Sequence, residues 1–439
     1  MKLGIKAKTG LGLVVAYTAY STYVHLRTHY EINDRLDKKL KSTDFGLTSN
    51  VSLRDGIPPS VQFRPMVVGG KFVNPFSQYR HQTLFEFVYC NIVNLFHLTP
   101  RGGLPKDPKE LKKLLPSVTP DYQLLSEPVK QVSALIPWKP KSFIPKPQDR
   151  ITLTWIGQSC AFVQLGGLNI LTDPFFGDHL VTSWMGPQRL SKAPCQYEDL
   201  PKVDIVLVSH DHPDHLEVDT VKKIGNSALW VVPLGVKKFL AKYGIYNVAE
   251  LNWWETMGLE TPKSQELGEK WTVACTPAMH WSGRKMYDAN STLWGSFMVM
   301  KDGKPHFFHA GDTGYSPELF RGIKEEYGPG CKLAMLPCGA YKPRWHLKSQ
   351  HIDPQEAVNV MKDLEARNMV GVHWGTFILS DEKFTEPRDS LHKIAEDAGV
   401  GNAVLAPKFG QTLVFDTSDG KGGSHPPEEI RDGKALLFR

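Results

Sequence analysis

Short apolar runs recur from Arg150 onward, and their spacing predicts strands separated by turns and helices. The segment 151–174, ITLTWIGQSCAFVQLGGLNILTDP, holds apolar stretches on both sides of a Gly-Gly turn, which is typical of an antiparallel hairpin. Later runs such as VDIVLVS, ALWVVP, WTVACTP and LAMLPC alternate with helical stretches such as VKKFLAKYG and DPQEAVNVMKDLEARN. This alternation predicts an α/β domain over residues 149–415, with sheets covered by helices.

The residues on either side of this domain follow a different pattern. Residues 31–148 are charged at first and then rich in proline, as in LTPRGGLPKDP and IPWKPKSFIPKPQ, with one expected helix at 80–97. This composition predicts an irregular N-terminal extension that wraps the larger domain and has no core of its own. The stretch SDGKGGSHPPEE predicts a flexible C-terminal tail over 416–439.

The first 30 residues are predicted to be a membrane anchor or a targeting segment. Three lysines precede an uncharged run from Thr9 to Leu26, and no acidic residue occurs before Glu31. This run is near the lower limit for a membrane-spanning helix, so a cleaved targeting segment and an ordinary amphipathic helix stay open. The basic, hydroxyl-rich start favours an anchor in an intracellular membrane, with the mitochondrial inner membrane ahead of other organelles.

Composition narrows the function classes without naming one. The 439 residues carry a net charge of +6 that is spread along the chain, so a dedicated nucleic-acid surface is not expected. Mild attraction to anionic lipid is compatible with this charge. Six cysteines occur without a CxxC pair and mostly beside apolar runs, which predicts buried, reduced thiols.

The stretch SHDHPDHL at 209–216 concentrates imidazole and carboxylate directly after an apolar run. A turn that follows a buried strand is where α/β folds place their sites. Further candidates follow other predicted strands, and the complete set is His210, His212, Asp214, His215, His280, Asp312 and His373. Such a set without thiolate suits zinc or another divalent first-row ion and exceeds what one tetrahedral ion needs, so we expect two metal ions.

The spacing within the motif indicates how one stretch serves two ions. Residues 210 and 212 point to the same side of an extended segment, whereas Asp214 and His215 follow a proline that bends the chain. Two ions about 3.5–4 Å apart hold a bridging hydroxide whose pKa lies near neutrality. We therefore predict a dinuclear centre that activates water.

These residues together resemble the metallo-β-lactamase fold, an αββα sandwich with a dinuclear metal site between its sheets. A closer likeness is to the N-acylphosphatidylethanolamine-hydrolysing phospholipase D family, carried by segments such as WIGQSC, DLPKVDIVLVSHDHPDHLE, TPAMHWSGR, AGDTGY and HLKSQHIDPQEAV. The likeness includes GGKFVNPF at 69–76 in the extension and runs from about residue 69 to about residue 410.

The resemblance implies that two zinc ions share the bridging carboxylate of Asp312. It assigns the other ligands to one ion each, with His210, His212 and His280 on the first and Asp214, His215 and His373 on the second. His351 is implied to be catalytic beside the metals, and Asp173 to orient a ligand histidine. Gln158 stands where many relatives carry histidine, which puts the surroundings of the ligands in doubt. A homodimer, which relatives form, is left open.

The implied reaction is hydrolysis of membrane N-acylphosphatidylethanolamine to phosphatidic acid and an N-acylethanolamine. Asp214 would steer the hydroxide, and His351 would protonate the leaving alkoxide. We expect Arg344 and Lys348 to contact phosphate or headgroups and Trp374 to line an acyl channel, with surface or core roles as the competing interpretation. The alternatives are a lactone or thioester hydrolase of the same fold and a membrane-bound scaffold without catalysis.

Overall fold

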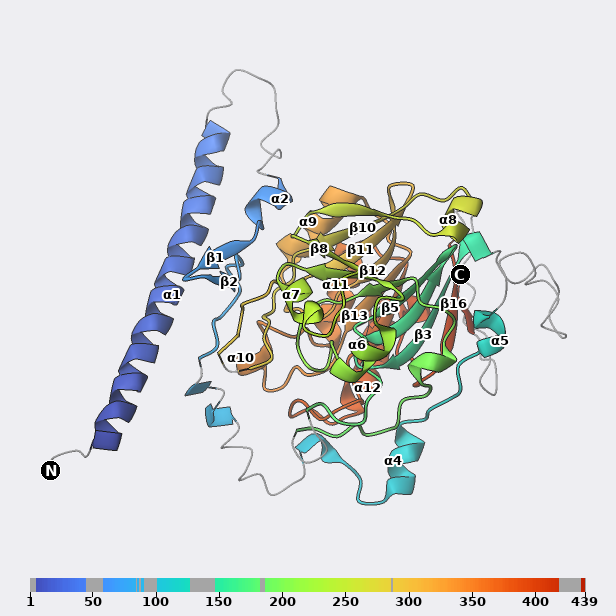
Figure 1. The fold of residues 1–439 in the computed structure, drawn as a ribbon, viewed down its shortest axis with the longest axis horizontal. Helices are drawn as coiled ribbons and strands as arrows, with labels where there is room; N and C mark the ends of the chain where they lie inside the picture. The colour runs from blue at the N-terminus through green and yellow to red at the C-terminus, as the bar shows by residue number, and fades with distance from the viewer. Residues whose placement is uncertain are drawn as a thin grey trace.

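The computed structural model describes residues 5–44, 58–83, 85–86, 88–90, 101–126, 147–181, 186–285, 287–417 and 436–438. Two large β-sheets form its body (Figure 1). In hydrogen-bonded order, the first sheet contains β15 (Val404–Leu405), β14 (Asn368–Val372), β13 (Leu333–Pro337), β12 (Lys304–His309), β11 (Ser296–Lys301), β10 (Trp271–Thr276) and β9 (Thr256–Leu259). The second contains β17 (Leu436–Phe438), β16 (Thr412–Asp416), β3 (Arg150–Gly157), β4 (Cys160–Leu165), β5 (Leu168–Thr172), β6 (Ile205–Leu207), β7 (Leu229–Pro233) and β8 (Val248–Leu251).

Successive side chains of the second sheet enter two different cores. Leu153 and Trp155 of β3 belong to the core that also contains residues of β10 and β11. The neighbouring Ile156 enters the other core, which includes residues of α6 (Val218–Ile224) and α7 (Val236–Ala241). Since a strand presents alternate side chains to opposite faces, burial on both faces explains the uninterrupted apolar runs. Five of the six cysteines are buried, as predicted, whereas Cys90 is partly exposed, and none of the six forms a disulfide among the described residues.

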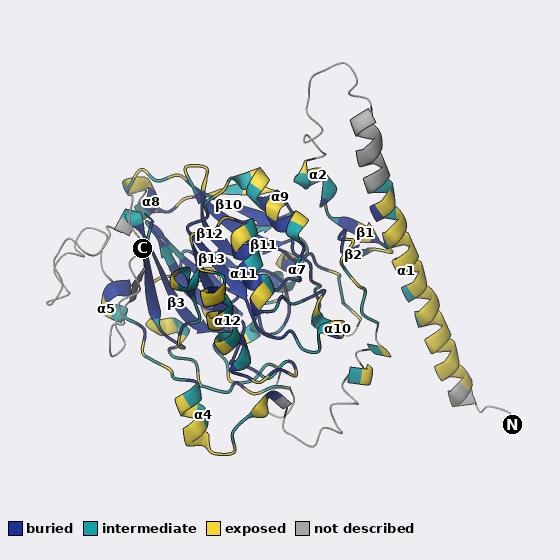
Figure 2. Ribbon diagram, turned by 180° about the vertical axis from the view of Figure 1, so that it is seen from behind, coloured by how far each residue is buried: buried dark blue, intermediate teal, exposed yellow. Residues whose placement is uncertain are grey.

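Helices cover the outer faces of the two sheets (Figures 1 and 2). The first sheet is covered by α9 (Pro317–Tyr327), α11 (Pro354–Asp363) and α12 (Glu386–Asp397), whose buried residues lie in the same core as its strands. The resulting order of layers confirms the predicted α/β sandwich. Shorter helices lie in the connections and the extension: α2 (Pro59–Gln62), α4 (Pro108–Leu114), α5 (Tyr122–Leu125), α8 (Pro262–Glu266) and α10 (Arg344–Leu347).

The extension begins with a long helix, α1 (Ile5–Asp44), which lies beside the hairpin β1 (Met66–Val68) and β2 (Lys71–Val73) (Figure 1). The expected irregular structure from residue 31 is therefore wrong for residues 31–44. Val24 and Ile32, eight residues apart on one face of α1, pack against apolar side chains of the hairpin. The predicted anchor run lies within α1, and none of the described helices combines the length and the apolar character needed to cross a membrane.

Two other expectations about the flanking segments are corrected in part. The tail is not flexible throughout, because β17 pairs in parallel with β16, with Leu436 opposite Leu413. Residues 418–435 lie outside the described residues. Of the helix expected at 80–97, residues 80–83 are not helical, residues 85–86 and 88–90 are, and residues 91–97 lie outside the described residues.

Candidate metal centre

The candidate ligands follow strands whose carboxyl ends share one rim. In the second sheet β5, β6 and β7 run parallel, and β6 ends shortly before His210. In the first sheet β12, β13 and β14 run parallel, with Asp312 after β12 and His373 after β14. His280 follows β10. Since parallel neighbours end at the same edge of a sheet, segments far apart in sequence bring these side chains together.

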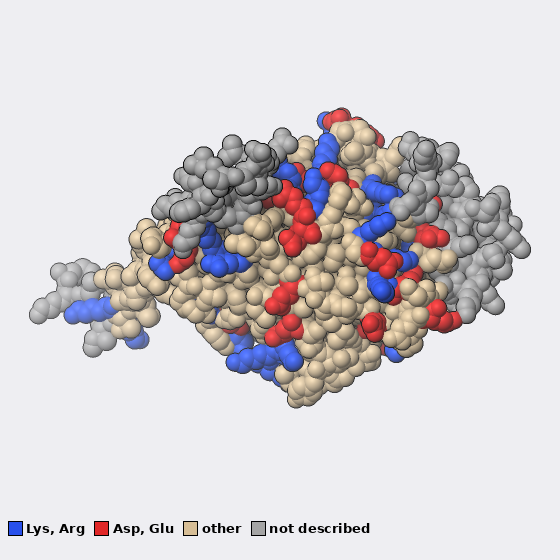
Figure 3. Space-filling model, turned by 90° about the horizontal axis from the view of Figure 1, so that it is seen from above, with Lys and Arg blue, Asp and Glu red and all other residues tan. Residues whose placement is uncertain are grey.

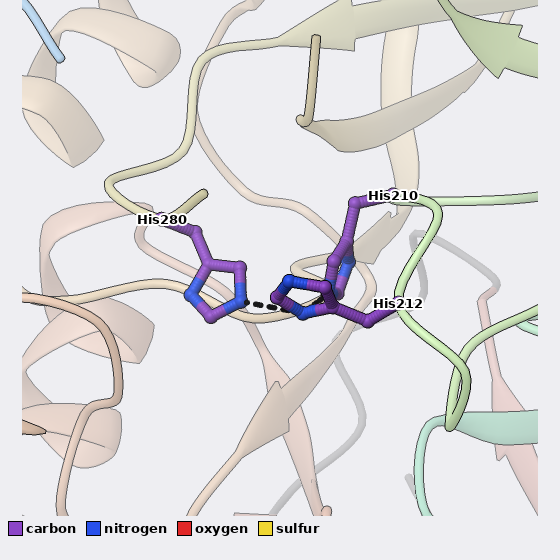
Figure 4. A group of neighbouring side chains, drawn as sticks. All are labelled: His210, His212 and His280. Atoms are coloured by element: carbon purple, nitrogen blue, oxygen red, sulfur yellow. Dashed lines mark hydrogen bonds between the residues drawn. The ribbon is translucent and has the colours of Figure 1, made fainter. Parts of the chain in front are cut away.

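The trihistidine group consists of His210, His212 and His280. Nε2 of His210 lies 2.8 Å from Nδ1 of His212, and Nε2 of His280 lies 3.4 Å from that same atom. Figure 4 shows the three rings, which come from two separate loops, turned toward one another. All three are buried, and their ligand atoms lie within 4.8 Å of one another. This spacing allows three imidazoles to hold one ion.

The carboxylate group consists of Asp214, His215, Asp312 and His373. Nε2 of His215 lies 3.2 Å from Oδ2 of Asp312, and Nε2 of His373 lies 3.2 Å from Oδ1 of the same carboxylate. Oδ2 of Asp312 is also 3.7 Å from Nε2 of His280. Asp312 therefore reaches both groups, as a bridging ligand must.

The two groups differ in charge. Burial lowers the pKa of His210 well below its usual range and lowers the pKa values of His212 and His280 to about 3. Burial also opposes the charged form of His373, but the Asp312 carboxylate outweighs it and the pKa of His373 rises to about 9. Without metal, the trihistidine group is therefore neutral, whereas the carboxylate group combines protonated imidazole with ionised carboxylate.

Several buried polar atoms at this centre lack a hydrogen-bond partner among the described residues. They include Nε2 of His215, Oδ1 of Asp312 and Nδ1 of His351, which lie 3.2 to 3.8 Å from other polar atoms of the centre but do not form hydrogen bonds of suitable geometry with them. Because a buried polar atom without a partner costs free energy, their concentration at one place indicates that another group satisfies them. Imidazole and carboxylate without thiolate fit divalent first-row cations. The residues present therefore fit a metal centre.

Asp173 contacts the ligands from behind, together with two residues that the sequence analysis missed. Its Oδ2 lies 2.7 Å from Nδ1 of His215 and 3.0 Å from Nε2 of His309. Ser209 donates its backbone N–H and its hydroxyl to the same carboxylate, at 2.7 and 2.8 Å. Burial opposes ionisation of Asp173, but His309 and His215 lower its pKa to about 2. Ser209 and His309 each lie within three residues of a predicted ligand in the sequence, and this proximity could have identified them.

Gln158 touches the carboxylate group directly. Its Nε2 donates to Oδ2 of Asp214 at 2.8 Å and lies 2.8 Å from Nε2 of His373. Its backbone carbonyl accepts the N–H of His373 at 3.1 Å. Gln158 therefore places an amide against two predicted ligands.

The backbone of His373 is strained. Its φ of 63° lies in the left-handed region, which is uncommon for residues other than glycine. Gly339 passes so close that a Cβ atom at that position would overlap the carbonyl oxygen of His373. Strain that is held in place by close packing at a ligand is typical of functional sites.

His351 lies beside the candidate ligands Asp312 and His280. Its Nδ1 is 3.8 Å from Oδ2 of Asp312, and its ring centroid is 5.1 Å from that of His280. These three residues form a further cluster of donors able to hold a metal ion. Burial lowers the pKa of His351 to about 3, so its imidazole is neutral at physiological pH.

The two predicted headgroup contacts have different surroundings. Arg344 donates to the carbonyl of His351 at 2.8 Å and forms ion pairs with Glu356 at 2.6 Å and Asp353 at 3.5 Å. The positive charge of Arg344 is thus balanced by two carboxylates at the start of α11, and its guanidinium supports the backbone of His351. These contacts differ from the predicted contact with phosphate. Lys348 is exposed.

Trp374 packs in the core and also lines a cavity. Its indole N–H donates to the carbonyl of Gly371 at 3.1 Å, and its ring lies 5.2 Å from that of Trp155 in the core. It also lines a cavity beside the metal centre, whose other walls include Gln158, His373, Phe377 and Ile378.

Comparison with known proteins first identifies the class of protein to which this chain belongs. Residues 168–374 match the family model described as a beta-lactamase superfamily domain. The structure of Igni18, a metallo hydrolase from Ignicoccus hospitalis, is similar over 61% of this chain and 98% of that chain, with 25% sequence identity and a TM-score of 0.45. The chain has the metallo-β-lactamase fold, with clusters of histidine and aspartate that can hold metal.

Two relatives then identify the family within that class. The N-acyl-phosphatidylethanolamine-hydrolyzing phospholipase D, mitochondrial, of Saccharomyces cerevisiae is 42% identical over 92% of this chain and 87% of its own length. The N-acyl-phosphatidylethanolamine-hydrolyzing phospholipase D 1 of Caenorhabditis elegans is 38% identical over 70% of this chain and 82% of its own. This chain belongs to the N-acylphosphatidylethanolamine-hydrolysing phospholipase D family.

Proposed function

We propose that this protein is a zinc-dependent phospholipase D that hydrolyses N-acylphosphatidylethanolamine to phosphatidic acid and an N-acylethanolamine. The observation that carries the proposal is the meeting of the trihistidine and carboxylate groups at one buried centre. Family membership supports the choice of substrate, because the yeast and nematode relatives are named for this hydrolysis.

We assign one zinc ion to each group, with Asp312 shared between them. Two divalent cations held by these residues would lower the pKa of a water between them and would neutralise negative charge on a phosphate. The contacts of Asp312 with both groups and the orphaned nitrogen atoms support this assignment.

The chain's own residues then guide the water and the leaving group. The amide of Gln158 fixes one oxygen of Asp214, and we assign this carboxylate the orientation of the attacking water. The water oxygen bonds to phosphorus while the bond from phosphorus to the ethanolamine oxygen breaks, and a proton from water ends on that oxygen. Because His351 is neutral, its role is a hydrogen bond to the leaving oxygen and not that of a cationic acid.

The cavity beside Trp374 supports a lipid substrate. Its walls combine Gln158 and His373 at the metal centre with the apolar side chains of Phe377, Ile378, Leu379 and Phe384. An apolar lining next to a few polar groups is typical of sites that bind a small molecule. We assign this cavity to part of an acyl chain, with the phosphate toward the metal centre.

The outer surface of α1 supports membrane association. Leu13, Val15 and Leu26 are 68%, 60% and 63% exposed, and Figure 2 shows most of the helix in yellow. Lys6 and Lys8 lie at its start without an acidic neighbour, which favours anionic lipid. On the face seen in Figure 3, basic and acidic side chains are interspersed. We propose an intracellular membrane location, with the mitochondrial inner membrane first, because the name of the yeast relative includes mitochondrial.

The test is hydrolysis of a synthetic N-acylated phosphatidylethanolamine in mixed micelles made with water enriched in oxygen-18. We expect phosphatidic acid that carries one heavy oxygen, an unlabelled N-acylethanolamine, and roughly two equivalents of zinc in the purified protein. Heavy oxygen found only in a released fatty acid would favour carboxyl-ester chemistry. Metal-free protein with no hydrolysis would favour a membrane scaffold.

A further inference from the structure

We propose that the N-terminal extension completes the metal centre, with Asn74 as a positioning residue for the trihistidine ligand His280. This role concerns metal binding alone, so its test does not depend on the lipid substrate proposed above. Figure 1 shows where it applies: the β1–β2 hairpin lies between α1 and the two-sheet body, and Asn74 directly follows β2.

Asn74 reaches the loop that carries the ligand. Its side chain is 1% exposed, and its Nδ2–H donates to the backbone carbonyl of His280 at 2.7 Å. The backbone N–H of Phe72 donates to the carbonyl of Asn290 at 2.9 Å, so the same strand is also bonded to the end of this loop. The extension thus fixes the backbone of a metal ligand that lies more than two hundred residues later in the chain.

The extension also positions the segment that contacts the other side of the His280 ring. Nδ1 of His280 faces the carbonyl of Gln350 at 2.9 Å, an arrangement that leaves Nε2 free for an ion. The segment that carries Gln350 is tied to the extension twice, by Ser349 Oγ to the carbonyl of Arg80 at 3.2 Å and by Gln82 to the carbonyl of His346. The extension therefore holds His280 both at its backbone and at its ring.

The choice of asparagine is not explained by packing. Oδ1 of Asn74 has no hydrogen-bond partner among the described residues, although the side chain is buried. The amide also contacts Tyr79 through a hydrogen bond, which opposes the rise in the pKa of the phenol that burial causes. A buried amide that leaves its oxygen unsatisfied lowers stability, so an apolar residue would suit a purely structural position better. The anchor of this segment is Phe76, which is 1% exposed and packs against Phe63 and Trp253. What Asn74 adds to that anchor is the N–H directed at the ligand loop.

The consequence is a selective effect on the trihistidine group. When the N–H is lost, the loop of His280 is free to shift, and Nε2 no longer stays in line with the nitrogens of His210 and His212. The carboxylate group does not depend on this contact, because its histidines are oriented by Asp173 and by the backbone of Gln158.

The experiment compares Asn74→Leu with the parent protein and with Gln78→Ala. Asn74→Leu keeps the approximate size of the side chain and removes the donor, while Gln78 is an exposed residue of the same extension that bonds to Glu318, away from the centre. Affinities for both zinc equivalents are measured by competition with a chromophoric chelator, and geometry is followed by the visible absorption of cobalt-substituted protein. We expect one equivalent to weaken about 10- to 100-fold and the cobalt spectrum to change, with no change in Gln78→Ala.

Two outcomes overturn the inference. The first is a folded Asn74→Leu protein that binds both equivalents with parental affinity. If Asn74→Leu does not fold, Gln82→Ala decides, because Gln82 acts on the ring side of His280 through the segment of His346. Parental affinity for both equivalents in Gln82→Ala would then reject the role of the extension. A parent protein that binds two zinc ions but hydrolyses no lipid would refute only the proposed function.

Discussion

The trihistidine group and the carboxylate group lie side by side, yet their histidines are oriented by different kinds of atoms. In the trihistidine group, Nδ1 of His210 faces the hydroxyl of Ser209 and Nδ1 of His280 faces a backbone carbonyl, both at 2.9 Å. In the carboxylate group, Nδ1 of His215 faces the carboxylate of Asp173 at 2.7 Å. Neutral oxygens orient the first group and an ionised carboxylate orients a histidine of the second.

This difference sets how each group competes with protons. A carboxylate behind an imidazole raises its basicity, so the histidines of the carboxylate group attract both a metal ion and a proton. The trihistidine group has lowered pKa values and stays neutral, ready to bind metal without first losing a proton. Two neighbouring ions in one centre should therefore respond differently to pH and to substitutions behind the ligands.

The largest expected effect comes from Asp312→Asn, which changes the carboxylate that contacts both groups. The amide cannot bridge two cations as a carboxylate does, so we expect one metal equivalent to be lost. Hydrolysis should fall by at least about 10³-fold, which corresponds to about 4 kcal/mol of transition-state stabilisation. Elemental analysis and release of phosphatidic acid measure the two effects.

The matched control is Asp302→Asn, in the turn between β11 and β12. This position is exposed and has a φ of 51°, which asparagine also tolerates, so the same chemical change is made far from the ligands. Parental metal content and activity are expected. Asp312→Asn protein that keeps two tightly bound ions would show that the groups do not depend on a shared carboxylate.

The next largest effect is expected from Asp173→Asn, which tests whether the carboxylate behind His215 is what distinguishes the second group. Loss of the charge should weaken binding of one zinc equivalent by about 10- to 100-fold, while the trihistidine group, which Asp173 reaches only through Ser209, is affected less. Chelator competition resolves the two equivalents. Equal weakening of both would remove the distinction drawn between the groups.

The ligands of both groups could be predicted from sequence because their chemistry and their position coincide. Each occurs after an apolar run that forms a buried strand, and the topology of parallel strands brings such ends to one rim. The α/β layers could be predicted for the same reason, since continuous apolar runs indicate strands buried on both faces.

The residues that orient the ligands could not be predicted, because their partners depend on the tertiary fold. Asn74 is an ordinary polar residue in a segment that was expected to be irregular, and only the fold brings it to His280. Arg344 suggested a phosphate contact by its charge, but the start of α11 supplies carboxylates that sequence spacing does not reveal. The structured end of the tail depends likewise on a distant strand, β16.

A pH-dependent effect sharpens the comparison further. In metal-free protein His373 has a pKa of about 9 and that of His215 is raised well above its usual value, in both cases because nearby carboxylates outweigh burial. Both are protonated at pH 7, and a zinc ion must displace those protons. Affinity of the carboxylate group should therefore rise between pH 6 and 8 by about tenfold per pH unit for each proton displaced.

The measurement is calorimetric zinc titration of the metal-free protein in buffers of different ionisation enthalpy. The equivalent that binds the carboxylate group should release protons at pH 7, and the one that binds the trihistidine group should release almost none, since the pKa values of His212 and His280 are about 3. Equal proton release for both equivalents would contradict the charge difference between the groups.

The smallest expected effect comes from Ser209→Ala, which acts on the opposite group from Asp173→Asn. The hydroxyl donates to Asp173 and lies 2.9 Å from Nδ1 of His210, so its loss frees the His210 ring without removing a charge. Loss of one neutral hydrogen bond costs about 0.5–1.5 kcal/mol, so the trihistidine equivalent should weaken only a few-fold to about tenfold. Ser264→Ala is the control, because this buried hydroxyl donates to the carbonyl of Thr261 at 3.0 Å at the start of α8. If Ser209→Ala weakened the carboxylate group more than the trihistidine group, Ser209 would act mainly through Asp173, and neutral oxygens would not be what orients the first group.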